Sequence, residues 1–540
     1  MLETKSRLNP TFFMKTNKTS TAMNYPSFCG CCHLSRRSFL MKGGAACSTA
    51  LGALTAPSVF GASEPAGPPR IRIVYVLFGP KQSRPTWPHI GFDFVPVMKR
   101  LEAELARQCP GFQFVTTMAS TEEEAKKILE EDRAAQVDGY LVYQMNNWPR
   151  VVQAIATSGK PVLYADFTYA GTGGFLTYNA AFLRSPSPNV GFVSSSELQD
   201  LVDAVKCFET IRQGRSPSEF VAATSRLRQQ RTPQPGNQAC VADPVRCLPI
   251  PECVSRLRES KILAIRDQKS APGTEIMGIP LVYVPFADLN DLAQKTNPDE
   301  VRSWADRWEK GAQRIEGVTR ETIEKSAAMY LGQKALMKKH GANAITINCL
   351  GGFYGNHISA YPCLGFCQLV DDGLVGACEC DIRSTAAMVA ITTLTQGRPG
   401  YISDPVMDSA NREIIYAHCV APTKVFGPSG TANPYQILTH SEDRQGASLR
   451  SLLPLGYLTT TVEFEPSRKE ILFHQAMAVG NDANDRACRT KLRARPLGDF
   501  EKLFTMWDAW GWHRVTFYGD LKEPVRALAD AVGWKVVTEA

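Results

Sequence analysis

The stretch Ile71-Arg72-Ile73-Val74-Tyr75-Val76-Leu77-Phe78, closed by Gly79, decides the fold of this 540-residue chain. A nearly continuous run of β-branched and aromatic residues that ends at a glycine is typical of a strand buried on both faces. Helical periodicity follows at residues 95–108, and a second strand is indicated at residues 112–116. This alternation predicts a mainly parallel sheet that helices cover on both faces.

The alternation continues along the chain and predicts an α/β fold. We expect two Rossmann-like parallel-sheet domains followed by a β-rich C-terminal domain, at residues 63–185, 186–405 and 406–540, after a leader at residues 1–62. Within the second domain, residues 215–256 are rich in proline, glutamine and arginine and are expected to form an irregular insertion. The other expected elements are strands at 139–142, 161–165, 190–193, 261–265, 280–284 and 344–348 and a long helix at 321–339.

The basic excess of the chain lies in its leader. Lysine plus arginine number 60 and aspartate plus glutamate number 53, which gives a formal net charge of +7. The first 62 residues hold seven of the basic residues and one acidic residue, so the rest carries 53 basic against 52 acidic residues. The charge therefore does not indicate nucleic acid as a partner, and a nearly neutral chain suits a small neutral ligand such as a sugar.

The leader has the layout of an export signal. Arg36-Arg37 and Phe39-Leu40 precede a weakly apolar stretch at residues 43–56 and a small-residue exit at residues 59–62. This order predicts a secretory signal read by the twin-arginine translocase, and hence a periplasmic or secreted protein. The alternative is a basic tail with a chance arginine pair. No later stretch reaches the roughly 20 apolar residues that a membrane span requires.

The cysteines do not form a zinc motif with paired Cys-x-x-Cys spacing. The densest group is Cys378-Glu379-Cys380-Asp381, in which a strand would direct the two cysteines to one face and the two acids to the other. A disulfide among Cys240, Cys247 and Cys253 is left open, because an oxidising compartment permits one. Most other cysteines are expected to be small buried hydrophobic residues.

Three segments gather ionisable side chains beside glycines and turns. The first runs from residue 377 through a helix at 384–394 to Asp404, and it places acids at a strand end, where α/β sheets bind ligands. A helix cap with a structural ion pair is the alternative. The other two segments contain His418, His440 and Trp512-His513. Imidazole and carboxylate groups from distant segments are typical of a catalytic metal site with open positions.

These segments, in this order, resemble the L-fucose isomerase and L-arabinose isomerase superfamily over residues 71–540. The run Ala377-Cys378-Glu379-Cys380-Asp381 with Thr385-Ala386-Ala387-Met388 is similar to that family's Glu-x-Asp junction. Thr395-Gln396-Gly397-Arg398-Pro399 with Asp404 resembles the stretch after it. Gly511-Trp512-His513 with Gly519-Asp520 resembles the closing motif that supplies the family's metal-binding histidine.

The resemblance implies a divalent metal, expected to be Mn²⁺, and aldose–ketose isomerisation through an ene-diol. It implies that Asp381 is a metal ligand and proton carrier, His513 a ligand, and Glu379 a supporting ligand and catalytic group. His418, His440, Asp404 and Trp512 are implied to bind the sugar. The family also implies a homo-oligomer.

One departure from the family leaves the activity open. Where the family carries an upstream glutamate, residues 348–355 read Asn-Cys-Leu-Gly-Gly-Phe-Tyr-Gly and contain no acid. This leaves a different substrate, a changed mechanism, or sugar binding without turnover. The leading hypothesis is an exported sugar isomerase-like protein, and the alternative is a non-catalytic carbohydrate-binding protein. A third hypothesis is a thiol or metal-handling protein built on Cys378 and Cys380.

Overall fold

The computed structural model describes residues 67–185, 188–267 and 269–540. The leader expected at residues 1–62, with its arginine pair, lies outside the described residues, so export stays a prediction. Within the described part of the chain, no helix combines the length and the apolarity that crossing a membrane requires.

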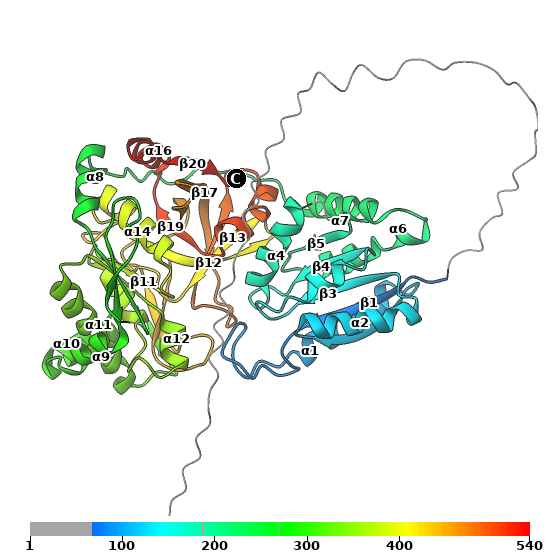
Figure 1. Ribbon diagram of the computed structural model, residues 1–540, viewed down its shortest axis with the longest axis horizontal. Helices are drawn as coiled ribbons and strands as arrows, with labels where there is room; N and C mark the ends of the chain where they lie inside the picture. Colours follow the sequence, from blue (N-terminus) through cyan, green and yellow to red (C-terminus); the bar gives the residue numbers. More distant parts are fainter. Residues whose placement is uncertain (1–66, 186–187, 268) are drawn as a thin grey trace, which may run out of the picture. The chain divides into compact units, whose positions relative to one another are not determined.

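Five parallel strands form the first sheet in the order β2-β1-β3-β4-β5 (Figure 1). They are β1 (Arg70–Val76), β2 (Gln113–Ala119), β3 (Gly139–Gln144), β4 (Val162–Asp166) and β5 (Val190–Val193). The helices of this region are α1 (Val95–Gln108), α2 (Glu122–Ala135), α3 (Val151–Ala156), α4 (Thr172–Arg184), α5 (Leu198–Lys206), α6 (Glu209–Arg212) and α7 (Pro217–Arg231). β5 pairs with β4 and completes the first sheet, although the sequence assigns it to the second domain. Its four apolar residues fit either sheet equally well, so they do not show which sheet the strand joins.

Capping residues decide where two of these helices begin. The hydroxyl of Thr121 accepts the backbone N–H of Glu124, whose carboxylate accepts the N–H of Thr121 in return. Ser216 and Glu219 form the same reciprocal pair at the start of α7. The expectation of an irregular insertion is therefore wrong for residues 217–231, because a capping box with a proline in the first turn starts a helix there.

The second sheet is also mainly parallel, in the order β11-β10-β6-β8-β7, with the two-residue β7 antiparallel at its edge. Its strands are β6 (Ile262–Arg266), β7 (Ala271–Pro272), β8 (Leu281–Pro285), β10 (Ala344–Ile347) and β11 (Val375–Ala377). The helices of this region are α8 (Ile250–Glu259), α9 (Phe286–Gln294), α10 (Pro298–Gly311), α11 (Arg320–His340), α12 (Cys349–Tyr354), α13 (Cys363–Asp371) and α14 (Ile382–Leu394). The α/β character with parallel sheets is confirmed, while the Rossmann-like class of the two domains and their boundaries stay predictions.

The last part of the chain forms a β-barrel-like domain, which confirms its predicted β-rich character. Its strands are β12 (Gly400–Asp408), β13 (Glu413–His418), β16 (Leu458–Glu465), β17 (Glu470–Asn481), β18 (Thr490–Pro496) and β19 (Arg514–Tyr518). Pairings run β16-β19-β12-β13-β18-β17, and β17 pairs with β16 to close the ring. β20 (Lys535–Thr538) joins β17 in parallel, and η1 (Phe500–Phe504), α15 (Trp507–Trp510) and α16 (Lys522–Ala531) complete this region. A small sheet of β9 (Arg314–Glu316), β14 (Tyr435–Leu438) and β15 (Ser448–Ser451) lies apart from the ring pairings.

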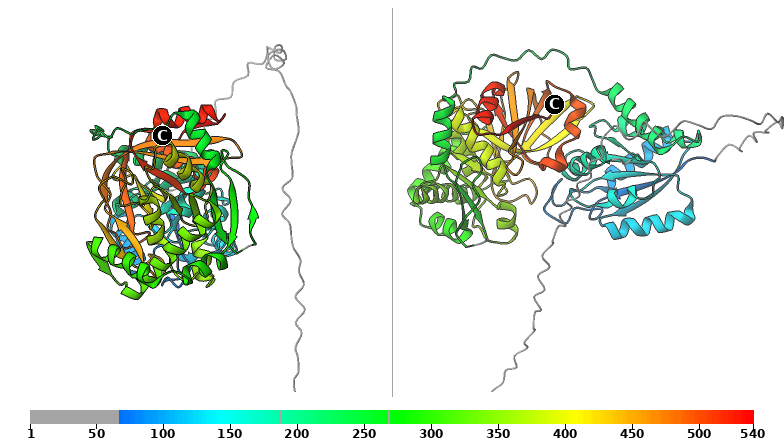
Figure 2. Two further views of the ribbon diagram at one scale, coloured as in Figure 1. Left: turned by 90° about the vertical axis from the view of Figure 1, so that its left-hand side faces the viewer. Right: turned by 45° about the horizontal axis from the view of Figure 1, so that its top comes forward.

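The expectation of an irregular insertion is also wrong for residues 250–256, because α8 begins at Ile250. Residues 232–249 have neither helix nor strand and connect α7 to α8 (Figure 2). The N–H of Val241 donates to the carbonyl of Gly456 at 2.8 Å, which ties the segment to the start of β16. Asp243 pairs with the guanidinium of Arg398. These contacts with the barrel domain explain how a segment without regular structure keeps one path.

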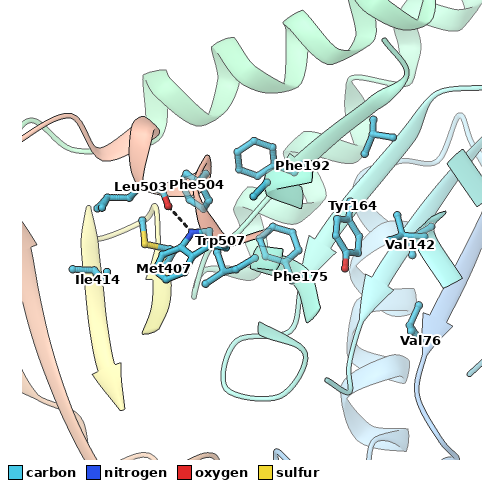
Figure 3. Packing of buried hydrophobic residues seen from close by; sticks show 14 of the residues in the cluster. Val76, Val142, Tyr164, Phe175, Phe192, Met407, Ile414, Leu503, Phe504 and Trp507 are labelled. Atoms are coloured by element: carbon cyan, nitrogen blue, oxygen red, sulfur yellow. Dashed lines mark hydrogen bonds between the residues drawn. The ribbon is translucent and has the colours of Figure 1, made fainter. Parts of the chain in front are cut away.

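An apolar core joins the first sheet to the barrel (Figure 3). The ring of Tyr164 in β4 lies 4.8 Å from that of Phe175 in α4. Phe192 of β5 lies 4.9 Å from Phe504 of η1, and Trp507 is fully buried beside them. Because burial of apolar surface contributes about 25 cal/mol per Å², this contact holds the two sheets that flank the pockets described below.

A buried ionic network closes the barrel near its C-terminal strand. The side chains of Arg514, Glu539 and His474 are fully buried, and the carboxylate of Glu539 lies 2.7 Å from Nη2 of Arg514 and 2.7 Å from Nδ1 of His474. Burial opposes ionisation of Glu539, but Arg514 and His474 lower its pKa to about 2. Arg514 also donates to the carbonyls of Gly511 and His513, so the network supports the segment that carries His513.

We predict that Glu539→Gln destabilises the protein by about 3 kcal/mol, because it leaves the buried guanidinium of Arg514 without a counter-ion. The pKa of Glu539 lies below its ordinary value, so its contribution is complete above about pH 4.5 and disappears as the pH falls towards 2. Urea unfolding at pH 7 and pH 3 measures both effects. The matched control is Glu523→Gln, whose partner Arg526 is exposed, and a change there as large as at Glu539 would contradict this assignment.

Candidate metal centre

Three neighbouring barrel strands bring Asp404, His418 and His513 together. Asp404 of β12 pairs with the residue that precedes His418 in β13. On the other side, Ser403 of β12 pairs with Arg514 of β19 in antiparallel register, so His513 lies opposite Asp404 just before β19. The register of the barrel therefore decides which of these side chains meet.

Glu379 reaches the same place from the end of the second sheet. β11 ends at Ala377, and Glu379 and Cys380 then adopt left-handed backbone with φ of 61° and 53°. Such backbone costs on the order of 1–3 kcal/mol at each non-glycine residue and is concentrated at functional sites. The expectation that residues 378–381 continue the strand is wrong, because this turn breaks the strand and carries Glu379 to the barrel end.

His513 lies at the centre of the group. Its Nε2 is 3.0 Å from Oδ1 of Asp404 and 3.4 Å from Oε2 of Glu379. Nε2 of His418 is 3.7 Å from Oε1 of Glu379 and 3.9 Å from Oδ2 of Asp404. One ligand atom from each of the four residues lies within 4.8 Å of all the others. The structure thus brings together residues from four separate segments.

Asp381 orients His513 from behind. Nδ1 of the His513 ring is 2.8 Å from Oδ2 of Asp381, while Oδ1 accepts the backbone N–H groups of Arg383 and Ser384 at the start of α14. A carboxylate that accepts one ring N–H of a histidine leaves the other nitrogen free for a metal. Asp381 is predicted from the sequence to be a ligand and proton carrier, but it lies outside the group of four and occupies the position of an orienting residue.

The surrounding carboxylates control the protonation of His513. Burial alone would lower the pKa of His513, but the neighbouring carboxylates of Asp381, Asp404 and Glu379 raise it well above its ordinary value. Positive charge is therefore stabilised at the centre of the group. A divalent cation would replace the Nε2 proton, because a metal and a proton compete for the same lone pair.

His418 differs from His513 in the hydrogen bond that its Nδ1 atom makes. The backbone N–H of Cys419 donates to Nδ1 of His418 at 3.0 Å. A neutral imidazole whose Nδ1 accepts a hydrogen bond carries its proton on Nε2. His418 therefore directs an N–H donor at the group, whereas Nε2 of His513 would offer a lone pair once a metal ion replaced its proton.

The group fits a divalent cation. Oδ1 of Asp404 and Nε2 of His418 are buried without a hydrogen-bond partner, although buried polar atoms in proteins are nearly always bonded. A mixed set of carboxylate oxygens and an imidazole nitrogen suits first-row divalent ions. Glu379, Asp404 and His513 would hold the ion, and the N–H of His418 would donate to an oxygen beside it.

Glu379 has a neighbouring carboxylate in the structure, although the sequence lacks the upstream glutamate of the family. Residues 348–355 contain no acid, and the sequence predicts Glu379 and Asp381 as the acid pair. In the structure, the carboxylate that faces Glu379 across the group belongs to Asp404, which is predicted from the sequence to contact the sugar. The sequence does not show that these two acids meet, because one lies on a barrel strand and the other on a turn after the second sheet.

A cavity of about 650 Å³ opens onto the group, a volume within the range of small-molecule sites. Trp87, Trp148 and Trp512 form its aromatic wall, with the rings of Trp87 and Trp148 5.2 and 5.4 Å from that of Trp512. Trp512 therefore lies where its predicted role requires. Trp507 and Trp510 are buried in the core.

His440 and Glu442 line the same cavity but lie outside the group of four. Burial opposes protonation of His440, but Asp443, 3.1 Å from Nδ1, raises its pKa to about 9. Burial raises the pKa of Glu442 to about 8, and the hydroxyl of Tyr354 donates to it at 3.0 Å. Near neutral pH the cavity thus contains an imidazolium and a protonated carboxyl beside the group.

Cys378 contacts Cys349, with 2.9 Å between the two Sγ atoms, and does not share a face with Cys380. The turn after β11 separates the two, so that Cys378 belongs to one apolar cluster and Cys380 packs against another. The predicted face of two cysteines is therefore wrong. All twelve cysteines of the described residues are free, including Cys240, Cys247 and Cys253.

Several cavity residues were not predicted from the sequence. Asn147 and Trp148 follow directly after β3, and the residues after a parallel strand lie at the edge where ligands bind, so a signal for them was present. Trp87 and Tyr354 had no such signal. Glu442 lies beside His440 in the sequence, but only its burial marks it as unusual.

The chain has only limited similarity to known proteins. No protein-family model matches the chain. Among solved structures, the "XylFII molecule" is 12% identical, with 54% of this chain and 86% of that chain covered and a TM-score of 0.15. A solute-binding protein of an ABC transporter from R. palustris, in complex with 4-hydroxybenzoate, is 11% identical, with 80% and 98% covered and a TM-score of 0.19. TM-scores this low do not bear on the fold.

The curated relatives are sulfoquinovose isomerases. Those of Priestia aryabhattai and Priestia megaterium (strain ATCC 12872 / QMB1551) are each 24% identical over 289 residues, which are 51% of this chain and 60% of the relative. That of Clostridium sp. (strain MSTE9) is 24% identical over 263 residues, 47% of this chain and 57% of the relative. The chain spans about 60% of the length of these relatives, and over about half of its own length it is similar to sugar isomerases.

Proposed function

We propose that the protein is a metal-dependent aldose–ketose isomerase of the L-fucose and L-arabinose isomerase type that acts on a free sugar. The observation that carries this proposal is the convergence of Glu379, Asp404 and His513, with an orphaned carboxylate oxygen, in a cavity with an aromatic wall. The likeness to sulfoquinovose isomerases supports an isomerase over other metal-dependent reactions.

A bound divalent ion, for which Mn²⁺ is proposed, supplies a Lewis acid that polarises the sugar carbonyl and stabilises an enediolate. Glu379 is proposed to move the proton between C2 and C1, because its pKa is held low by His513 and its carboxylate is the more exposed of the two acids in the group. A general base must be ionised and able to reach its substrate, and Glu379 meets both conditions. Asp381 keeps Nδ1–H of His513 bound and so keeps the ring in place.

The remaining cavity residues are proposed to bind the sugar. The N–H at Nε2 of His418 has no partner and would donate to a sugar oxygen. Glu442, whose carboxyl stays protonated near neutral pH, would donate to a second oxygen. Trp87 and Trp512 offer apolar surface to the less polar face of the ring and exclude water from the reacting carbons.

The charge of the cavity favours a neutral sugar. The carboxylates of Glu379, Asp381 and Asp404 line it, while Glu442 stays protonated near neutral pH and the imidazolium of His440 is paired with Asp443. Among the lysines and arginines of the described residues, only Arg383 lines the cavity. That guanidinium is already engaged, since it donates to Glu465 at 2.8 Å and to the carbonyl of Trp510 at 3.2 Å. A sulfonate or phosphate on the sugar would find no unpaired cation on this wall.

We further propose that the chain is exported to the periplasm or secreted, as its leader predicts, and that it assembles as a homo-oligomer. The support for export is the order of charged, apolar and small-residue regions around Arg36-Arg37. The alternative function is carbohydrate binding without turnover. Residues 348–355, which lack the family's acid, are the observation that favours this alternative.

The first prediction concerns metal content. Asp404→Asn and His513→Gln should abolish Mn²⁺ binding, because each removes one of three proposed ligands. Asp381→Asn should retain a site that is roughly 10–100-fold weaker, because it removes an orienting carboxylate and no ligand. Isothermal titration with Mn²⁺ on the metal-free chain measures all three.

The matched control is His89→Gln, which changes a histidine outside the cavity and should bind Mn²⁺ like the unaltered chain. A loss of binding in Asp381→Asn as complete as in Asp404→Asn would show that Asp381 is a ligand. Unchanged binding in Asp404→Asn and His513→Gln would remove the metal centre from the proposal.

The second prediction concerns turnover. In D₂O with Mn²⁺, the mature chain should convert a neutral aldose to its ketose, with exchange of the C2 proton visible by ¹H NMR, and Glu379→Gln should abolish both. kcat/KM for the neutral sugar should exceed that for its 6-sulfonated counterpart by at least tenfold, because the cavity acids repel the sulfonate. Preference for the sulfonated sugar would contradict the charge assignment. Sugar binding without turnover would favour the non-catalytic alternative.

A further inference from the structure

A second cavity, of about 730 Å³, lies between the first sheet and the barrel, and none of its lining residues lines the metal cavity. The first sheet contributes the ends of β4 and β5, and α1 and α5 close one side. The barrel contributes the end of β12 and the segment that follows β17. The cavity therefore lies at the edge of the first sheet, outside the carboxyl ends of its parallel strands, where α/β proteins bind ligands.

Asp166, the last residue of β4, is the buried acid of this cavity. It is 5% exposed, and its carboxylate accepts hydrogen bonds from one side chain, the hydroxyl of Thr172 at 2.9 and 3.1 Å. A carboxylate offers about four acceptor positions, so Asp166 retains unused capacity. Burial raises its pKa to about 7, despite the opposing effect of Thr172 and Arg486, which shows how poorly the protein itself compensates this charge.

Arg486 is the matching cation on the barrel side. Its Nη1 is buried and has no hydrogen-bond partner, and its Nε makes one long bond of 3.4 Å to Oδ1 of Asn484. The guanidinium lies 4.5 Å from the centre of the Phe167 ring. Within the described part of the chain it forms no ion pair, not even with Asp166, whereas Arg493 on the same wall pairs with Glu413 at 2.7 Å.

A purely structural role does not account for these two side chains. A buried carboxylate and a guanidinium with a buried nitrogen that served only stability would form an ion pair, because leaving each alone incurs part of the desolvation cost of a charge. The cavity keeps them apart instead. A ligand with an anionic group and a hydrogen-bonding group at its other end would satisfy both.

The remaining walls indicate the kind of molecule that carries these groups. Phe92, Tyr143 and Phe167 form an aromatic side, with Phe92 and Tyr143 ring centres 6.1 and 5.8 Å from that of Phe167. Thr168, which is 8% exposed, adds a hydroxyl, while Ser196 and Asn411 donate to the carboxylate of Asp408, which also lines the cavity. Aromatic surface opposite hydroxyl and carboxyl groups is complementary to a hydroxylated ring or chain.

We propose that this cavity is a second ligand site for a small hydroxylated carboxylate of the sugar-acid type. The guanidinium of Arg486 binds the ligand's carboxylate, Asp166 binds its hydroxyl groups, and the aromatic side contacts its carbon skeleton. The site does not depend on the metal centre or on isomerase activity. A neutral sugar would leave Arg486 unpaired, and a simple carboxylate such as acetate would leave Asp166 unpaired.

Isothermal titration of the full mature chain in the presence of EDTA tests this site, with D-galacturonate and D-gluconate as sugar acids and D-galactose as the neutral control. At least one sugar acid should bind, and Arg486→Gln should weaken it at least tenfold. Asp166→Asn, which keeps an acceptor for Thr172, should also weaken it. The matched control Arg444→Gln changes a half-buried arginine outside this cavity whose partner Asp485 is also bound by Arg489, and this variant should bind the acid unchanged.

Three outcomes would overturn the proposal. The first is that neither acid produces heat at concentrations up to the millimolar range. D-galactose could bind as tightly as the acids, which would exclude the assigned ligand class. Binding could persist in Arg486→Gln and disappear in Glu379→Gln, which would place the acid in the metal cavity. Circular dichroism of each variant separates loss of binding from loss of the fold.

Discussion

The structure depends on one constraint, which is that two carboxylates and two imidazoles meet at the end of the barrel with little access to water. Glu379, Asp404, His418 and His513 have ligand atoms within 4.8 Å of one another. Like charges this close are tolerated only when a cation lies among them, and the raised pKa of His513 shows that the protein provides one by protonation. The register of β12 with β13 and β19, the strained turn at Glu379 and the bond from His513 to Asp381 all serve to hold this arrangement.

The fold could be predicted well where signals are local. Helix α1 occupies the expected residues, Thr121 caps α2 as its sequence indicates, and the apolar run at residues 71–78 is the central strand β1. Errors arose where pairing is non-local or where a cap was overlooked. β5 is assigned from the sequence to the second domain but pairs in the first sheet, because four apolar residues do not show which strand they pair with. Helix α7 is not predicted, although the capping box of Ser216 and Glu219 indicates its start.

The candidate site could be predicted in membership but not in roles. Local motifs indicate His513 and Glu379, whereas the position of Asp404 inside the group of four and of Asp381 behind His513 follows from the barrel register and from the turn after β11. Neither is visible in residue spacing. The unpaired Arg486 and Asp166 of the second cavity show the same limit, because their lack of partners is a property of three-dimensional packing. β12 carries Asp404 to one cavity and Asp408 to the other, so both depend on the same strand.

Anomalous diffraction from a crystal of the Mn²⁺-loaded protein tests the central claim most directly. The account predicts one strong peak at about 2.0–2.3 Å from a carboxylate oxygen of Glu379, one of Asp404 and Nε2 of His513, with Asp381 still bound to Nδ1 of the same ring. A peak coordinated by Asp381, or no peak among these residues at saturating Mn²⁺, would contradict it.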